Sequence, residues 1–312
     1  MKMNKLTVIV PAYKTDFLAE ALRSILGQSV IPDRIIVFDD ASPYPVRDIV
    51  SGFGGSVEYY RFEANLGGRD LVSHWDRCIK KVDSEWVWLF SDDDVADNNC
   101  VELFLQGVDN CSQIDLFRFD TRIIDAESVC IELCPPNPQN ESPADFLYFR
   151  LRGQRSSFVP NYIFRRERWL AIGGFVNFQR AWCSDDATWA VIAEKSGIYT
   201  VNKAKVAWRM SGQNISSGGG VGATQKYQAS IAFSRWVLEW QEKSGNEILN
   251  SRWIIDQWLI RQINVIGARP PIWYLNLVID TRRNGKAKRT VLLARSVFEY
   301  YLKAFLKFII IR

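Results

Sequence analysis

Histidine is almost absent from the sequence and its cysteines are not paired, and both shortages narrow the chemistry open to the chain. The 312 residues include one histidine, His74, and six cysteines, none of them in a CxxC pair. A structural zinc site has poor support, because such sites need several cysteine or histidine ligands at short spacing. Isolated thiols without a regular framework are typical of a reduced cytoplasmic protein. We expect His74, which falls in a predicted helix, to be structural.

Long apolar segments are also missing. The first apolar run covers only Leu6–Val10 before Pro11 interrupts it, so we expect no secretory signal peptide. No stretch approaches the roughly 20 apolar residues that a membrane-spanning helix needs. No GxGxxG motif follows the first predicted strand, which argues against a dinucleotide-dependent oxidoreductase. We therefore expect a cytoplasmic protein that does not cross a membrane.

Charge is distributed unevenly along the chain. The net charge is +4, and residues 281–312 alone carry nine lysines and arginines against one acid, which leaves residues 1–280 acidic. One polar stripe runs along this tail at steps of four residues: Arg295, Glu299, Lys303 and Lys307. A basic, apolar helix suits an anionic membrane surface, so we expect peripheral attachment to the inner face of the cell membrane. Docking on the domain or on a second subunit is the alternative, and no base-reading motif suggests nucleic acid.

The first 120 residues alternate between short β-branched runs and segments with helical spacing. The expected strands are Leu6–Val10, Ile35–Phe38, Val57–Phe62, Glu85–Phe90 and Ile114–Phe119. This order predicts an α/β fold with a mainly parallel sheet and helices on both faces. Ligands bind such sheets at the carboxyl ends of the strands.

Beyond residue 120 the pattern is less regular. A proline-rich loop is expected over Cys134–Pro143 and a glycine-rich loop over Ser216–Gly222, after which the pattern is mostly helical. We expect one domain over residues 1–222, with halves 1–120 and 121–222, followed by a helical C-terminal region over residues 223–312.

Polar clusters follow three of the predicted strands. They are Pro11-Ala12-Tyr13, Asp39-Asp40 and Asp92-Asp93-Asp94. Adjacent carboxylates repel one another when buried, and a bound Mg²⁺ or Mn²⁺ would remove that repulsion; a solvated acidic turn that caps the next helix is the alternative. A carboxylate of Asp39-Asp40 could accept a hydrogen bond from a base or ribose, or the pair could form a turn with Ser42 and Pro43. Tyr13 could stack on a nucleobase or be an ordinary half-buried tyrosine.

Together these clusters resemble the ordered motifs of family-2 glycosyltransferases, which are inverting enzymes with the Rossmann-like GT-A fold. The matching segments are Thr7–Tyr13, Val37–Ser42, Asn65–Gly67 and Phe90–Asp94, with a looser match to about Ser217. The resemblance implies transfer of a sugar from a nucleotide-diphosphate sugar, a UDP-sugar before others, to a hydroxyl of a glycan or lipid-linked acceptor. Bacterial surface polysaccharide biosynthesis is the setting that it implies.

The resemblance also assigns roles in donor binding. The residues that would contact the nucleotide sugar after the first four strands are Pro11, Ala12, Tyr13, Asp40, Arg69 and Asp92. Tyr13 would stack on the base above a turn shaped by Pro11, Asp40 would hydrogen-bond the base or ribose, and Arg69 would approach the nucleotide. Asp92 would face the ribose or the sugar.

A divalent metal, Mn²⁺ or Mg²⁺, is the cofactor that the resemblance implies. Asp93 would bind it between the two phosphates, with Asp94 as a further carboxylate. Family members often carry a histidine at the position of Ser211, and serine does not replace imidazole as a ligand for a soft or borderline metal. Either metal affinity is weak here, or Arg209 and Ser216 take a larger part in binding phosphate.

The catalytic base is expected near residue 185. Gly173-Gly174-Phe175 and the later Ser184-Asp185-Asp186 resemble the family's Gly-Gly-Phe turn and Glu-Asp pair, with Ser184 in place of the glutamate. Asp185 would take the proton of the acceptor hydroxyl, with Asp186 as its substitute. A helix N-cap is the alternative for Asp185.

Two rival functions use a similar fold. A sugar-nucleotide nucleotidyltransferase should have a glycine-rich loop after the first strand, where Pro11-Ala12-Tyr13 stands instead. A degenerate protein that binds nucleotide without turnover is kept open by the departures at Ser184 and Ser211.

Overall fold

The computed structural model describes residues 5–212, 222–248 and 250–276. Its strands belong to one sheet and are β1 (Leu6–Ala12), β2 (Arg34–Asp39), β3 (Glu58–Arg61), β4 (Trp86–Leu89), β5 (Val95–Ala96), β6 (Leu116–Ile124), β7 (Cys130–Leu133), β8 (Asn140–Glu141), β9 (Tyr162–Arg165) and β10 (Ile198–Arg209). The strands expected in the first 120 residues are confirmed, while the two-residue strands β5 and β8 are too short to leave a pattern in the sequence.

The helices fall between these strands and after them. They are α1 (Leu18–Leu26), α2 (Val46–Ser51), α3 (Leu71–Ile79), α4 (Cys100–Asn110), α5 (Pro143–Leu151), α6 (Arg166–Ala171), α7 (Ser184–Ile192), α8 (Ala223–Ser244) and α9 (Ser251–Ile266), with short 3-10 turns η1 (Val159–Asn161) and η2 (Gln179–Ala181). Among the described residues, no helix combines the length and apolar character needed to span a membrane.

The sheet has a parallel half and a mixed half. Its order is β3-β2-β1-β4-β9-β6-β10-β5. Strands β3, β2, β1 and β4 are mutually parallel, whereas β9 runs antiparallel to both β4 and β6, and β10 is again parallel to β6. The expected parallel architecture therefore holds where the nucleotide-binding motifs lie, and β9 reverses direction between the two halves.

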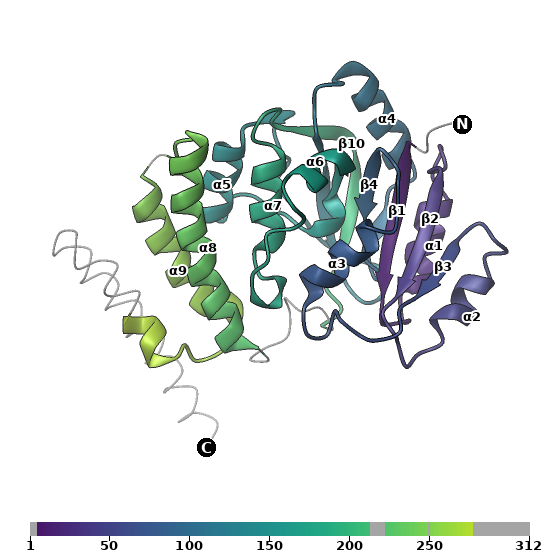
Figure 1. Ribbon diagram of the computed structural model, residues 1–312, viewed down its shortest axis with the longest axis horizontal. Helices are drawn as coiled ribbons and strands as arrows, with labels where there is room; N and C mark the ends of the chain where they lie inside the picture. Colours follow the sequence, from purple (N-terminus) through teal and green to yellow (C-terminus); the bar gives the residue numbers. More distant parts are fainter. Residues whose placement is uncertain (1–4, 213–221, 249, 277–312) are drawn as a thin grey trace.

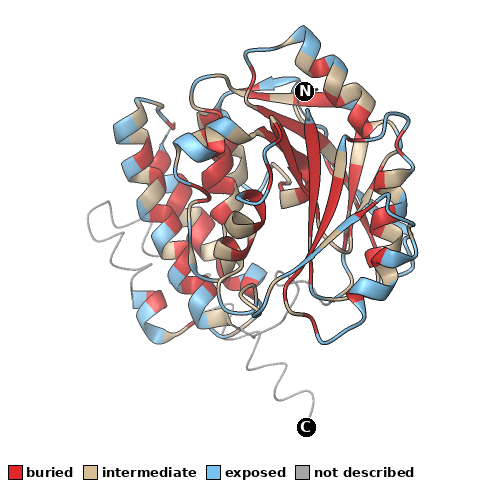
Figure 2. Ribbon diagram, turned by 45° about the vertical axis from the view of Figure 1, so that its right-hand side comes forward, coloured by how far each residue is buried: buried red, intermediate tan, exposed pale blue. Residues whose placement is uncertain are grey.

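Helices cover both faces of the sheet, as expected (Figure 1). Side chains alternate along β1, so Ile9 packs into the core under α3 and α7, while Val8 and Val10 pack into the core under α1 and α4. The central strands are almost continuously buried (Figure 2), which is typical of a sheet covered on two sides. The carboxyl ends of β1, β2 and β4 then lie at one edge.

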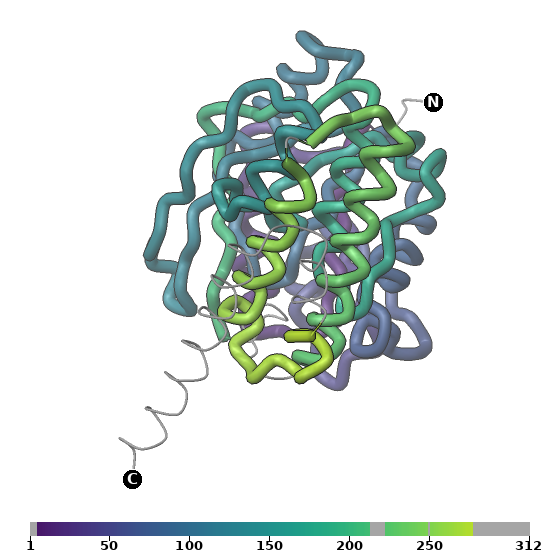
Figure 3. The backbone as a smooth tube through the Cα atoms, turned by 90° about the vertical axis from the view of Figure 1, so that its left-hand side faces the viewer, coloured from purple at the N-terminus to yellow at the C-terminus, as the bar shows by residue number. Residues whose placement is uncertain are grey.

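The last two described helices pack against each other and against the rest of the molecule (Figure 3). Their buried side chains, including Phe233 and Trp258, belong to the same apolar core as α5 and α7. In Figure 1 the pair lies on the side of the molecule away from β2 and β3. The helical character expected after Ala223 is confirmed as far as residue 276, and the basic stripe of residues 281–312 lies outside the described residues.

Candidate active site

A cavity of about 750 Å³ opens at the carboxyl ends of β1 and β4. Its walls come from the segments after these strands, from the loop before α3, from the segment before α7, and from α5 and α9. The sequence-predicted residues that line it are Pro11, Ala12, Tyr13, Asp40, Asp92, Asp93, Asp185 and Asp186. A volume of this size is typical of a site for a small molecule, and acidic groups from distant parts of the chain meet in it.

Asp92, which follows β4, is hydrogen-bonded to the segment that follows β1. Its Oδ2 accepts hydrogen bonds from the backbone N–H groups of Tyr13 at 3.1 Å and Lys14 at 3.2 Å. Tyr13 is 41% exposed and packs edge-to-face on Tyr44, with ring centroids 6.4 Å apart. One face of an aromatic side chain is thus held at the cavity wall, and stacking on a base stays a prediction.

The other two carboxylates of the triplet differ in their access to the cavity. Asp93 lines it, and burial followed by the negative charge of Asp92 raises the pKa of Asp93 to about 7. Asp94 is fully buried below, where its Oδ1 accepts the backbone N–H of Arg209 at 2.7 Å. Helix α4 begins at Cys100, so the alternative of an acidic turn capping that helix is wrong.

The fit of a divalent cation depends on how many ligands the protein must supply. Within the described residues, no group of three or more acidic, histidine or cysteine side chains is arranged as a metal site. Mg²⁺ and Mn²⁺ sites often need only one or two carboxylates, with phosphate oxygens and water completing the shell. Asp93 lines the cavity and meets that requirement, and burial raises the pKa of the neighbouring Asp92. Asp94 does not reach the cavity.

Asp40 is a structural centre for the loop before α3. Its carboxylate accepts hydrogen bonds from the backbone N–H of Leu66 at 2.9 Å and of Gly67 at 2.7 Å, and from Asn65 Nδ2 at 2.8 Å, and it pairs with Arg77. A Cβ on Gly67 would lie 2.8 Å from Asp40 Oδ2, which explains the glycine. Little capacity remains to accept a bond from a base or ribose, so the predicted ligand contact is replaced by loop positioning.

Asp39, the preceding carboxylate, forms the turn that the sequence suggested as an alternative. Its Oδ1 accepts the backbone N–H of Ser42 at 2.7 Å, and its Oδ2 pairs with Arg61. Both acids at the end of β2 therefore hold protein segments in place.

Arg209 was expected to bind phosphate, and its position does not support that role. The side chain is 0% exposed. Its guanidinium donates to the backbone carbonyls of Asp93 at 2.7 Å and Asp125 at 3.0 Å, and to Glu20 Oε2 at 2.7 Å. The guanidinium also lies over the Phe17 ring, 4.3 Å from the centroid. Through these contacts the guanidinium holds the acidic segment of residues 92–94 in place.

Two other predicted donor contacts are not brought to the cavity wall. Arg69 is exposed, and the cavity is lined by its neighbours Gly67 and Gly68 and not by Arg69 itself. Ser216 lies outside the described residues, so its predicted contact with phosphate stays a prediction.

Asp185 and Asp186 occupy different environments although they are adjacent. Arg150 binds Asp186 through Nη2 at 2.7 Å and Nε at 3.0 Å, and Asp186 is 3% exposed. Asp185 is partly exposed in the cavity, and burial followed by the charge of Asp186 raises the pKa of Asp185 to about 7. Helix α7 begins at Ser184 with Cys183 as N-cap, so the N-cap alternative for Asp185 is wrong. The pairing with Arg150 leaves Asp185 as the better placed proton acceptor.

The segment before α7 contributes cavity residues that the sequence analysis missed. Arg180, Ala181 and Cys183 have φ angles of 60°, 54° and 65°, a conformation that non-glycine residues rarely adopt and that often marks a functional site. Arg180 and Trp182 line the cavity. None of these three positions has a glycine or asparagine, which favour positive φ angles, so the sequence did not indicate this conformation.

Helix α9 also reaches the cavity, through Trp258, Arg261, Gln262 and Val265. The sequence analysis placed this helix outside the domain of residues 1–222. The sequence did contain a signal of this contact, because Gln262 lies at helical spacing from Trp258 and Leu259. In the structure Gln262 is only 6% exposed. A polar residue on the buried face of a helix is the observation that points to a site.

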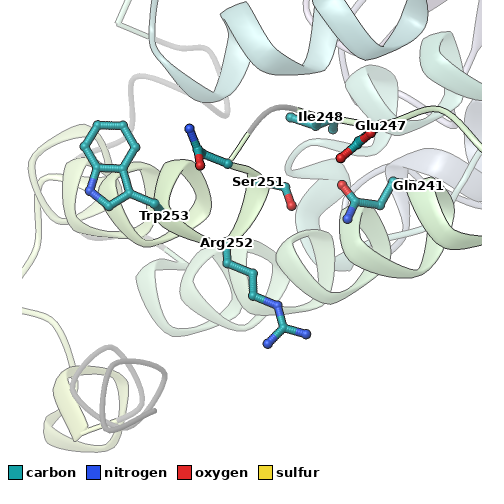
Figure 4. Close-up of a pocket in the computed structure, with 7 residues that line it drawn as sticks. Gln241, Glu247, Ile248, Ser251, Arg252 and Trp253 are labelled. Atoms are coloured by element: carbon teal, nitrogen blue, oxygen red, sulfur yellow. The ribbon is translucent and has the colours of Figure 1, made fainter. Parts of the chain in front are cut away.

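A second, smaller pocket of about 320 Å³ lies between the end of α8 and the start of α9. Figure 4 shows Gln241 and Glu247 side by side, whereas Arg252 and Trp253 point away from them. Polar groups do not converge there, and none of the predicted site residues lines it. The acidic cavity is therefore the candidate active site.

Comparison with known proteins points to a protein family. The family model described as "Glycosyl transferase family 2" matches residues 7–126. Galactofuranosyltransferase GlfT1 of Mycobacterium tuberculosis is 30% identical over 95 residues, 30% of this chain and 31% of that protein. Succinoglycan biosynthesis protein ExoW of Rhizobium meliloti is 40% identical over 52 residues, 16% of each chain. The alignment thus spans about a third of the first relative and less of the second.

Solved structures extend the likeness over most of the chain. S. aureus TarS 1-349 in complex with UDP-GlcNAc aligns with a TM-score of 0.65 at 16% identity, covering 89% of this chain and 81% of that one. The same protein in complex with UDP aligns with a TM-score of 0.64. At this identity the likeness concerns the fold alone. The likeness to these structures supports the GT-A fold for this chain. Residues 7–126, which include the acidic edge of the sheet, match the glycosyltransferase family 2 model.

Proposed function

We propose that the protein transfers a sugar from a nucleotide-diphosphate sugar to a hydroxyl of a glycan or lipid-linked acceptor, with inversion. The observation that carries this proposal is the meeting of Asp93, from the end of β4, and Asp185, from α7, in one cavity. A donor-binding half over residues 1–120 and an acceptor-binding half over residues 121–222 would then share that cavity. Because α9 also lines it, we extend the acceptor-binding part to α9.

The proposed reaction needs one base and no protein acid. Asp185 takes the proton from the acceptor hydroxyl while that oxygen attacks the anomeric carbon. The bond from this carbon to the diphosphate oxygen breaks, and its electron pair leaves with the nucleotide diphosphate. A divalent cation at Asp93 would offset the charge of that leaving group. Arg150 pairs with Asp186 beside the base, and the charge of Asp186 adds to burial in raising the pKa of Asp185.

Titration of UDP into the protein by calorimetry, with and without Mn²⁺, tests the donor half of the proposal. We expect manganese-dependent binding to be lost in Asp93→Asn, because the amide keeps the shape of the side chain and removes its charge. Asp83→Asn, at an exposed position outside the cavity, is the matched control and should bind like the parent. If UDP fails, GDP and dTDP are tested in the same way. Failure of all three nucleotides would overturn the transferase proposal.

Membrane attachment through residues 281–312 stays a prediction, and with it the peripheral cytoplasmic location. The full chain is expected to float with anionic liposomes at low salt and to be released at high salt, because attraction to charged lipid is screened. A chain shortened after residue 276 should remain at the bottom of the gradient. Equal behaviour of the two chains would remove the tail from any role at the membrane.

A further inference from the structure

One end of the cavity is built by elements other than the strand ends that hold Asp93. Its walls there come from α5, η2 and α9, and include Arg150, Gly153, Arg180, Trp182, Arg261 and Gln262. Helices α5 and α9 pack on each other, and both lie away from β1 and β2 in Figure 1. Asp185 lines the same cavity, so a molecule bound at this end is on the acceptor side of the proposed base.

This end of the cavity has more cationic side chains than carboxylates that pair with them. Arg150 is paired with Asp186. Arg180 and Arg261 form no ion pair with any described residue, and Arg180 Nε is buried without a hydrogen-bond partner among those residues. Arg261 reaches one protein acceptor, the backbone carbonyl of Leu151. Both side chains are half-buried, and removing part of a guanidinium from water without a carboxylate partner has a free-energy cost that a bound anion would offset.

Like charges make the imbalance larger. Burial, followed by repulsion from Arg152, lowers the pKa of Arg261. Burial, followed by repulsion from Arg180, lowers the pKa of Lys226, whose ammonium lies 4.9 Å from the centroid of the Trp182 ring. One cation of each pair, Arg261 and Arg180, lines the cavity, and an anion bound to these two side chains would offset the repulsion that each takes part in.

The surrounding groups suit a sugar. Trp182 and Trp258 offer aromatic faces, and Gln262 offers an amide that can both donate and accept hydrogen bonds. Apolar faces with a few convergent polar groups are typical of sites for small polar ligands. An acceptor that fits this end has a sugar ring that packs on the indoles and a negative charge that pairs with the arginines.

We propose that this end of the cavity is an acceptor subsite for a sugar that carries a carboxylate or phosphate, held by Arg180 and Arg261. The inference rests on the proposed transferase function, since it names the class of acceptor. The donor diphosphate, which we propose to bind at Asp93, is a second possible source of negative charge, and the nucleotide affinities measured below distinguish the two. Guanidinium groups bind carboxylate and phosphate through paired N–H donors, so either anion satisfies the site.

Binding of three matched sugars to the full chain tests the proposal. The probes are methyl glucoside, methyl glucuronide and methyl glucoside 6-phosphate, which share one ring and differ in charge. They are titrated by ligand-observed NMR, with and without the nucleotide found to bind in the calorimetric test. We expect at least one charged probe to bind about tenfold or more tightly than the neutral one, because charged hydrogen bonds in a partly buried site are strong.

Variants separate the subsite from general effects of charge. Arg261→Gln and Arg180→Gln should each remove the preference for the charged probe, while Arg261→Lys should retain part of it. Arg252→Gln removes the same charge from α9 at an exposed position outside this cavity and should change nothing. Nucleotide affinity should be unaltered in all four, and loss of nucleotide affinity with unchanged probe binding would assign the arginines to the donor and overturn the proposal. Equal affinities for the three probes, or no binding of any, would also overturn it.

Discussion

Replacing Asp185 with asparagine is expected to lower the rate of sugar transfer by about 10²–10⁴-fold, the usual contribution of a positioned general base. The amide has nearly the same size and cannot take the acceptor proton. Nucleotide binding should persist, because Asp185 belongs to α7 and not to the strand ends that would hold the donor. Single-turnover kinetics with a saturating donor measure the effect on the chemical step.

The neighbouring carboxylate gives a matched comparison. Asp186 is bound by Arg150 through its Nε and Nη2 atoms, so Asp186→Asn should weaken the fold around α5 and α7 and leave measurable transfer. If Asp186→Asn were the more damaging of the two for turnover at a temperature where both variants are folded, the assignment of the base would be wrong.

The same residue sets an expected pH dependence. Asp185 accepts a proton only when it is ionised, and burial with the charge of Asp186 raises the pKa of Asp185 to about 7. Below that pH, kcat/KM should therefore rise about tenfold per pH unit, and it should level off above it. Asp186→Asn removes a like charge and should move this limb to lower pH, because the pKa of Asp185 falls. An activity that is flat from pH 5 to 8 would contradict the role of Asp185.

The parallel half of the fold could be predicted because each local signal agrees with its neighbours. The run Leu6–Val10 is β-branched, Gly27 closes the helix that follows it, and both elements recur at those places in the structure. The reversal at β9 was not predictable in this way. Tyr162–Arg165 is as apolar as the parallel strands, and direction depends on which neighbour a strand pairs with and not on its composition.

The sequence predicted which residues lie near the cavity better than it predicted what each of them contacts. Asp40 and Arg209 both follow or belong to strands near the cavity, as the motifs indicated, but each spends its polar atoms on protein partners. Spacing along a strand places a charged residue at an edge of the sheet. It does not determine whether backbone groups reach that residue first, which depends on loops that are distant in sequence. Arg180 and Arg261 were missed for a related reason, because only tertiary packing brings η2 and α9 to the cavity.

Arg209→Met is expected to destabilise the protein by about 3–5 kcal/mol, because it leaves buried acceptors without donors. The groups that lose a donor include the carbonyls of Asp93 and Asp125 and the carboxylate of Glu20. For a chain of this size the midpoint of thermal unfolding should fall by about 10 °C. Urea unfolding followed by fluorescence or circular dichroism measures the change.

A phosphate-binding role for Arg209 makes the opposite prediction. Removal of a ligand contact would lower nucleotide affinity and leave stability nearly unchanged. Arg209→Lys helps to separate the two roles, because it keeps the positive charge and cannot reproduce the set of donors that joins Glu20, Asp93 and Asp125. Arg209→Lys should therefore lose most of the stability that Arg209→Met loses. A stable Arg209→Lys variant with weakened nucleotide binding would return this arginine to the donor site.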